Sequence, residues 1–238
     1  MIDLNTLPLP DLYRTLRASG LVTRLLELAR DEDLGERWEQ GDVTSRAFVP
    51  NHLRGKASIV FRNAGVVAGL ACVDEVLHLY RADVDFVPTV ADGRPVEAGA
   101  VVGTLTGNLR AILGVERPIL NLLGRLSGVA SRTARFVQAA AAGGSKARVY
   151  DTRKTTPGLR TLEKYAVRCG GGLSHRLGLF DAVLIKDNHL AAVRIPTSGG
   201  PGAFAETVTH AAARARDEAG REGLRFVMLE VDTLDQLA

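Results

Sequence analysis

Between residues 149 and 189, five cationic side chains lie where the chain is expected to turn, each beside a run of apolar residues. Such a cluster is either solvated loop charge or a binding site for an anion. A guanidinium group binds carboxylate or phosphate through two parallel hydrogen bonds, and an ammonium group supplies a point charge to phosphate. Because the five groups recur at the ends of successive predicted elements, we favour the anion site. They are Arg153, Lys154, His175, Arg176 and Lys186.

One carboxylate accompanies these cations. Glu230 follows an apolar run, and it would be isolated among positive charges unless it met a metal ion or a sugar hydroxyl. A Mg²⁺ ion on a substrate phosphate would satisfy it, because Mg²⁺ binds carboxylate and phosphate oxygens together. We therefore predict a small, multiply anionic substrate that includes a phosphorylated sugar. His175 and Lys186 are the candidates for proton transfer, while His189 either contacts the ligand or caps a strand end.

Three predicted strands place the charged residues at their carboxyl ends. Apolar runs at 147–150, 182–186 and 225–231 alternate with helical patterns at 159–168 and 201–219. Continuous apolar runs are typical of parallel strands buried on both faces, and strand–helix units of this length imply right-handed crossovers. Ligands of parallel α/β sheets lie at the carboxyl ends of the strands. The sequence therefore predicts that the charged groups share one rim of a parallel sheet, open or closed into a barrel.

The first half of the sequence predicts an antiparallel sheet instead. Strand patterns cover residues 57–61, 83–90 and 100–106, and a further predicted strand at 109–113 follows the hairpin-type dipeptide Gly107-Asn108. Loop signals lie at 31–35 and 41–44. The predicted helices are 11–29 with a break at Ser19-Gly20, 73–80, 116–140 with Pro118 in its first turn, and one that starts at Leu234.

These patterns predict an α+β domain over residues 1–115 and a parallel α/β domain over residues 116–238. No cluster in the first domain indicates chemistry, so we interpret it as a scaffold or lid. Gly124 and Gly128 lie one above the other on the long helix. Either another element approaches the helix closely there, or the helix is simply imperfect, at up to about 1 kcal/mol per glycine.

Composition narrows the class of protein. The chain has 238 residues, 46% hydrophobic and 24% charged, with no apolar run of the ~20 residues that a membrane span needs and no signal-peptide pattern. Its two cysteines, Cys72 and Cys169, argue against a disulfide scaffold. A net charge of +3 with only 5% aromatic residues argues against nucleic-acid binding. We predict a cytoplasmic protein that binds neither membranes nor nucleic acid.

Three motifs in the cationic stretch resemble the nicotinate-nucleotide pyrophosphorylase family, also called quinolinate phosphoribosyltransferase. Segments 32–44, 68–69 and 116–128 match the same family, so the resemblance covers nearly the whole chain in order. It implies an N-terminal α+β domain with an antiparallel sheet, followed by an incomplete parallel α/β barrel. The three motifs are Asp151-Thr-Arg-Lys-Thr-Thr-Pro-Gly158, Cys169-Gly-Gly-Gly with His175-Arg176, and Leu184-Ile-Lys-Asp-Asn-His189.

The resemblance implies a Mg²⁺-dependent pentosyltransferase of NAD biosynthesis. Such an enzyme transfers phosphoribosyl from phosphoribosyl pyrophosphate to quinolinate, and the products are nicotinate mononucleotide, pyrophosphate and CO₂. The catalytic residues would be Lys154, Lys186 and Glu230. The substrate-binding residues would be Arg117, Thr152, Arg153, Lys154, His175, Arg176, Lys186 and Glu230.

Each of these residues has an implied role. Arg153, His175, Arg176 and Lys186 would hold the quinolinate carboxylates. Lys154 would meet phosphoribosyl pyrophosphate, and Glu230 would face the ribose and the metal, which the substrate would otherwise hold. Arg117 would enter the site of a neighbouring subunit, so the active form would be a homodimer or a larger assembly.

The resemblance departs from the family at the C-terminus. Family members continue through further strand–helix units, which carry an Asp-Asn strand end and a glycine-rich loop for the 5′-phosphate, whereas this sequence ends at Ala238. We interpret the catalytic domain as truncated and expect little or no activity from the 238-residue chain. Two alternatives stay open: a related phosphoribosyltransferase acting on another acid, and a truncated inactive paralogue that only binds anions.

Overall fold

The computed structural model describes residues 3–35, 41–192, 200–218 and 224–231. The chain divides into two compact units, which we describe separately: a larger unit, Leu4–His175, and a smaller unit, Met1–Asp3 with Arg176–Ala238. The helix predicted from Leu234 lies outside the described residues. Among the helices within these ranges, none combines the length and the apolar character that a membrane span requires.

The larger unit begins with two helices, α1 (Leu9–Arg17) and α2 (Leu21–Leu34), as the Ser19-Gly20 break predicted. The loop predicted for 31–35 is wrong except at its last residue. Acidic residues are tolerated inside a helix, and α2 ends only at Gly35, whose φ of 80° is in the left-handed region that favours glycine.

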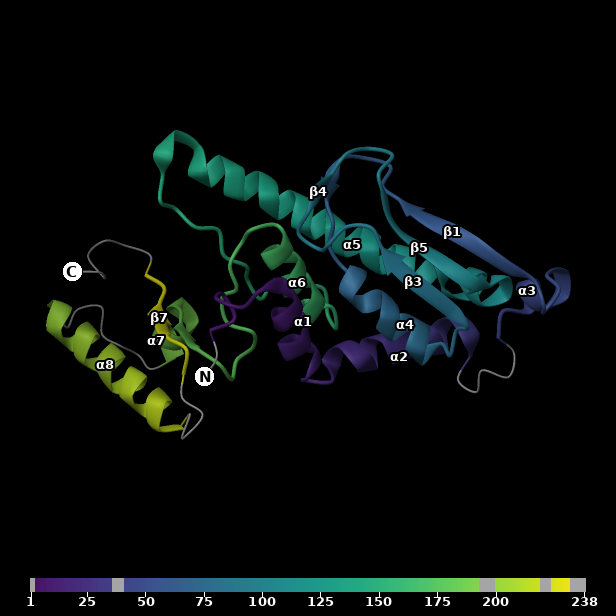
Figure 1. The fold of residues 1–238 in the computed structure, drawn as a ribbon. Coiled ribbons are helices and arrows are strands. Elements are labelled where there is room, and N and C mark those ends of the chain that lie inside the picture. The colour runs from purple at the N-terminus through teal and green to yellow at the C-terminus, as the bar shows by residue number, and fades with distance from the viewer. Residues whose placement is uncertain (1–2, 36–40, 193–199, 219–223, 232–238) are drawn as a thin grey trace. The chain divides into compact units, whose positions relative to one another are not determined.

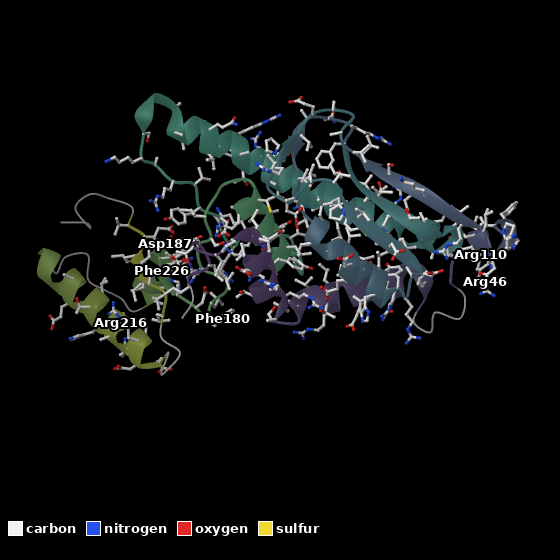
Figure 2. The ribbon with its side chains drawn as sticks, in the orientation of Figure 1. Arg46, Arg110, Phe180, Asp187, Arg216 and Phe226 are labelled. Atoms are coloured by element: carbon white, nitrogen blue, oxygen red, sulfur yellow. The ribbon has the colours of Figure 1, made fainter. Side chains whose placement is uncertain are left out.

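The loop signal at 41–44 marks the start of a helix instead. Asp42 caps α3 (Val43–Phe48), and its side chain accepts a hydrogen bond from the Ser45 backbone N–H at 3.0 Å. Arg110 ties the far end of α3 to the rest of the unit. Its guanidinium donates to the carbonyl oxygens of Val49 at 2.5 Å and Arg46 at 3.1 Å (Figure 2).

The antiparallel sheet predicted for the first half of the chain is confirmed. Its strand order is β1-β5-β3, with both pairs antiparallel. A second, two-stranded antiparallel pair joins β2 to β4, and the helix predicted at 73–80 forms as α4 after a 3₁₀ turn. The bounds are β1 Arg54–Val60, β2 Gly65–Val66, η1 Leu70–Cys72, α4 Val73–Leu79, β3 Val84–Pro88, β4 Pro95–Val96 and β5 Val101–Asn108.

The strand predicted at 109–113 is wrong. β5 continues through Asn108, and the long helix α5 (Leu109–Ala141) starts at the next residue. Asn108 is the N-cap of this helix, because its side chain accepts a hydrogen bond from the Ala111 backbone N–H at 3.1 Å. Asn and Gly are favoured in hairpin turns and also at helix starts, so the dipeptide alone did not distinguish the two.

Pro118 lies inside α5 rather than in its first turn, because the helix begins seven residues earlier than residue 116. Proline in a helix interior costs about 3 kcal/mol. Burial of one continuous apolar face offsets that cost. Figure 1 shows α5 running along the sheet and on past it, and the helix packs against β1, β2, β5 and α6. Its buried side chains include Ile112, Val115, Pro118, Ile119, Leu123, Leu126 and Ala130.

Beyond α5 the predicted helix forms as α6 (Arg160–Cys169), but the strand predicted at 147–150 is reduced to a single parallel bridge between Tyr150 and Leu173. Gly170 explains part of the Cys-Gly-Gly-Gly motif. A Cβ added there would lie 2.3 Å from the Ala130 carbonyl oxygen, so only glycine allows the end of α6 to approach α5.

The smaller unit contains the other parallel pair. Strand β6 pairs with β7 in parallel register, Val183 opposite Val227 and Ile185 opposite Leu229. This pairing confirms the parallel strands predicted at 182–186 and 225–231, and the helix predicted at 201–219 forms as α8. The barrel and the domain boundary at residue 116 stay predictions. The bounds are β6 Val183–Ile185, α7 Asp187–Ala192, α8 Gly200–Glu218 and β7 Val227–Leu229.

Candidate functional site

Three predicted site residues follow the Tyr150 bridge in the larger unit. Thr152 turns the chain locally, because its hydroxyl accepts a hydrogen bond from the Lys154 backbone N–H at 3.0 Å. The side chains of Thr152 and Lys154 are exposed, whereas Arg153 is half-buried. The buried Nε of Arg153 has no hydrogen-bond partner within the described part of the chain. An unsatisfied guanidinium donor is what a carboxylate or phosphate ligand would engage.

A cavity of about 670 Å³ opens between this segment, α5 and α6. Its volume is within the range of small-molecule sites. Gly124 and Gly128 lie along its α5 wall, and a Cβ added at either would meet no atom within 4 Å. In the described structure, therefore, no element approaches these two glycines closely. The charged and hydroxyl residues that line the cavity are Arg125, Arg132, Thr133, Tyr150, Asp151, Thr152, Lys154, Thr155, Glu163 and Lys164.

A buried ion pair underlies the cavity. The side chains of Lys164 and Asp151 are 1% and 4% exposed, and Lys164 Nζ bonds to Asp151 Oδ1. The same oxygen accepts the His175 backbone N–H at 2.8 Å. Burial raises the pKa of Asp151 above its ordinary value, although Lys164 and the His175 N–H act in the opposite direction. Asp151 Oδ2 is buried without a partner among the described residues.

A second carboxylate, Glu163, lies one residue before Lys164 on α6. It accepts hydrogen bonds from Arg125 Nε at 3.0 Å and Nη2 at 2.6 Å, and from the Thr156 backbone N–H at 3.1 Å. Burial alone would raise the pKa of Glu163, but the hydrogen bonds from Arg125 and Thr156 hold it below its ordinary value. Glu163 is therefore ionised at neutral pH.

His175 is the fourth predicted residue in the larger unit, where it is half-buried. Its backbone position is held from two directions. Asp151 accepts its N–H, and the side chain of Asn5 pairs with the backbone of the preceding Ser174, accepting from its N–H at 2.7 Å and donating to its carbonyl at 3.0 Å. Arg176, the next residue, belongs to the smaller unit, where it is buried and donates to the Ala182 carbonyl at 3.4 Å.

The smaller unit brings Lys186 and Glu230 together. Each follows directly on its strand, β6 or β7, and the Lys186 Nζ lies 2.7 Å from Glu230 Oε2. The pair is 40% and 51% exposed, so its charges are within reach of a ligand. The meeting of these two strand ends was predicted. His189 caps the end of β6, because its Nδ1 accepts the Lys186 backbone N–H at 3.0 Å.

Arg117 lies on α5 and does not line the cavity. Its side chain is 72% exposed and its Nη2 is 3.7 Å from Glu116 Oε1, so a role in a neighbouring subunit stays a prediction. The described residues contain no group of three or more His, Cys, Asp and Glu that could hold a metal ion by themselves. A metal at Glu230 would therefore need further ligands from outside this set of residues.

Sequence reasoning missed Arg125, Arg132, Glu163 and Lys164 as residues of the cavity. One available signal pointed to Lys164. The chain has only five lysines, and Lys164 lies in the same stretch as the two motif lysines, Lys154 and Lys186. Lys164 lies in a helix with no motif character of its own, so its position inside the cavity wall became visible only in the structure.

Comparison with known proteins covers both halves of the chain. Residues 42–127 match the family described as "Quinolinate phosphoribosyl transferase, N-terminal domain", and residues 129–238 match the corresponding C-terminal domain. A NadC structure from Streptococcus pyogenes is 37% identical with a TM-score of 0.73, over 90% of this chain and 70% of that one. A nicotinate-nucleotide pyrophosphorylase structure from Ehrlichia chaffeensis is 32% identical with a TM-score of 0.74, over 90% and 70%.

Curated relatives agree with this similarity. A probable nicotinate-nucleotide pyrophosphorylase [carboxylating] of Synechocystis sp. is 45% identical over 161 residues, which is 68% of this chain. A protein of the same description from Bacillus subtilis is 38% identical over 206 residues, or 87% of this chain. The chain spans 52% and 64% of the lengths of these two relatives.

Proposed function

We propose, since the chain belongs to the quinolinate phosphoribosyltransferase family, that it transfers phosphoribosyl from phosphoribosyl pyrophosphate to quinolinate. The products would be nicotinate mononucleotide, pyrophosphate and CO₂. The observation that carries the proposal is the cationic segment at 152–154, of which Thr152 and Lys154 line a cavity of small-molecule size in the larger unit. Residues 1–115 would form the α+β domain and residues 116–238 the incomplete parallel α/β barrel.

Quinolinate has two adjacent carboxylates, which require more than one cation. Arg153, His175, Arg176 and Lys186 are the residues we assign to them. The unpartnered Nε of Arg153 supports this assignment, because a carboxylate would satisfy it. Holding both carboxylates would orient the pyridine nitrogen at the carbon that it attacks, which supplies part of the rate enhancement through positioning.

Phosphoribosyl pyrophosphate would meet Lys154 and Thr152. Lys154 contributes a mobile point charge suited to phosphate oxygens, and both residues line the cavity. Departure of pyrophosphate leaves positive charge on the ribosyl carbon, as in glycoside hydrolysis. We assign stabilisation of that charge to the carboxylate of Glu230. Lys186, 2.7 Å from Glu230, would release it when the quinolinate carboxylate takes the ammonium group.

Glu230 would also be the chain's contribution to a Mg²⁺ site. A single half-exposed carboxylate fits an ion whose other ligands are phosphate and ribose oxygens. When bound, the ion would neutralise the pyrophosphate leaving group. Arg117, exposed on α5, would serve a neighbouring subunit, so the active assembly would be a homodimer or larger.

Loss of CO₂ follows from the chemistry of the ring. Ribosylation puts a positive charge on the pyridine nitrogen, and that charge stabilises the electron pair that stays on the adjacent ring carbon when its carboxylate leaves as CO₂. No proton donor is needed for bond breaking, only for the final protonation of the ring carbon. A lysine or histidine side chain beside the carboxylates could supply that proton.

Binding and turnover together test the proposal. Calorimetric titration should show quinolinate binding in the micromolar range and weaker binding of nicotinate, which lacks the second carboxylate. Release of pyrophosphate that depends on quinolinate measures turnover. Lys154→Met should weaken pyrophosphate binding, whereas Lys146→Met, a change at an exposed lysine outside the cavity, should not.

Three outcomes separate the alternatives. Equal affinity for nicotinate and quinolinate would favour a related enzyme acting on another acid. Quinolinate binding without turnover would favour an inactive paralogue that only binds anions. Absence of binding to both quinolinate and pyrophosphate would contradict the proposed function.

A further inference from the structure

Two adjacent residues of α6, Glu163 and Lys164, contact opposite ends of one short segment. That segment, residues 151–156, carries Thr152, Arg153 and Lys154. Lys164 bonds to Asp151 at its start, and Glu163 accepts the Thr156 backbone N–H at its end. Both contacts come from one rigid helical turn, so the distance between the two ends of the segment is set by the helix.

The contact of Lys164 with Asp151, at the start of the segment, also involves a residue outside the segment. Asp151 Oδ1 receives both the Lys164 ammonium and the His175 backbone N–H, the latter at 2.8 Å. Tyr150 and Leu173 form the parallel bridge just before these residues. Lys164 therefore fixes Asp151, and Asp151 fixes the backbone of His175, which is 24 residues away in sequence.

The contact at the end is reinforced from α5. Arg125 donates two hydrogen bonds to Glu163, at 3.0 Å and 2.6 Å, and its Nη2 also reaches the Thr156 hydroxyl at 2.8 Å. Glu163 and Arg125 thus enclose Thr156 from backbone and side chain. Both donors of Arg125 reach the same carboxylate oxygen, Glu163 Oε1, and a charge-assisted contact of this kind restricts the direction of the side chain.

Stability alone does not account for a pair as buried as Lys164 and Asp151. Apolar side chains of similar volume usually stabilise a core as well as a buried ion pair or better. A charged pair does offer geometric definition, since hydrogen bonds to an ionised group restrict direction and distance. The Asp151 carboxylate can also bind a backbone N–H, which an apolar side chain cannot do.

We propose that Glu163 and Lys164 are positioning residues, which hold both ends of segment 151–156 and thereby place Thr152, Arg153, Lys154 and His175 for ligand. The identity of that ligand rests on the proposed function. The claim that segment 151–156 is held at both ends does not rest on the proposed function, because its contacts lie within one unit of the chain. Neither Glu163 nor Lys164 needs to touch the substrate to act in this way.

Hydrogen exchange of the parent chain and three variants tests the fixed segment directly. Glu163→Gln and Lys164→Met each remove one end, and Asp83→Asn removes an exposed ion pair far along the sheet as the matched control. The amides of residues 152–156 should exchange at least about 10-fold faster in the first two variants, as expected when a local contact opens. The amides of β5 report the stability of the whole unit, so exchange at 152–156 should accelerate more than exchange in β5 in the first two variants.

Arg125→Gln adds a variant that leaves the buried Lys164–Asp151 pair intact, and the Arg125 side chain itself is 52% exposed. It should accelerate exchange near Thr156 even if Lys164→Met fails to fold. Unchanged exchange at 152–156 in both Glu163→Gln and Arg125→Gln would overturn the proposal.

Ligand titration distinguishes positioning from a general structural role. Pyrophosphate affinity should fall about 10- to 100-fold in both Glu163→Gln and Lys164→Met, because a displacement of about 1 Å has effects of that size. Quinolinate affinity should fall more in Lys164→Met, which also releases His175. A purely structural role would lower both affinities only in proportion to the unfolded fraction, and that result would contradict the proposal. If the variants exchange faster at 152–156 but the chain binds neither ligand, the proposed function is contradicted, while the role of Glu163 and Lys164 in holding the segment is supported.

Discussion

Lys164→Met should destabilise the larger unit strongly at pH 7. The side chains of Lys164 and Asp151 are 1% and 4% exposed, so the substitution leaves a carboxyl group inside the protein with no cation beside it. Removal of one partner from a buried pair costs about 3–5 kcal/mol. Burial raises the pKa of Asp151 even in the presence of Lys164. We therefore expect the variant to fold with Asp151 protonated.

That protonation limits the size of the loss. A carboxyl group whose ordinary pKa is about 3.9 requires about 4 kcal/mol to stay protonated at pH 7. The Coulomb energy of the lost pair adds nothing beyond this, because the charge is no longer there. For a domain of this length each kcal/mol lowers Tm by about 2–4 °C, so the variant should melt roughly 10 °C below the parent chain.

The loss should also shrink as the pH falls. In the variant the folded-state pKa of Asp151 lies above the unfolded value, so this group lowers stability above the unfolded pKa and ceases to do so below it. The reference is the double variant Lys164→Met/Asp151→Asn, which has no titrating group at this place. The difference in unfolding free energy between the single and double variants should decrease by about 1.4 kcal/mol per pH unit from pH 7 to pH 4.

Urea unfolding followed by circular dichroism, repeated at several pH values, measures both quantities. Asp83→Asn is the control, because the Arg54–Asp83 pair is 59% and 71% exposed and exposed pairs contribute about 0–1 kcal/mol. A loss no larger than that of the control would refute the reasoning. A difference in unfolding free energy between the single and double variants that does not change with pH would also refute it.

Three further predictions concern the same unit. Burial alone would raise the pKa of Glu163, but hydrogen bonds hold it low. Glu163→Gln should therefore lower the free energy of unfolding by about 1–2 kcal/mol above pH ~4.3. Urea unfolding should show this difference from the parent chain vanish as the pH falls through the folded-state pKa. Asn108→Ala removes an N-cap bond and should cost about 1 kcal/mol in the same assay; no change would exclude capping. Gly107→Ala would put a Cβ 2.3 Å from the Asp83 carbonyl and should destabilise strongly, whereas Gly128→Ala, with nothing within 4 Å, should stabilise by up to about 1 kcal/mol. Equal melting temperatures for these two variants would contradict both expectations.

Local signals were sufficient for most of the secondary structure. The break at Ser19-Gly20 and the helix predicted at 159–168 depend on neighbours a few residues away, and both predictions were confirmed. The strand predicted at 109–113 was wrong because a short segment with four apolar residues out of five fits a strand or a buried helix equally well. Its true state was decided by Asn108, which caps α5, and by the sheet packed against that helix.

The sequence by itself determined the family, the charged residues of its motifs and the meeting of Lys186 with Glu230 at two parallel strand ends. Only the tertiary structure decided which charged groups face solvent and which are buried. Lys154 and Lys164 are lysines ten residues apart, yet the first is exposed beside a cavity and the second is 1% exposed against Asp151. Desolvation depends on what packs against a side chain from distant parts of the chain, here α5 and the backbone at His175. No local pattern carries that information, which is why the residues that hold the segment at 151–156 emerged from the structure and not from the motifs.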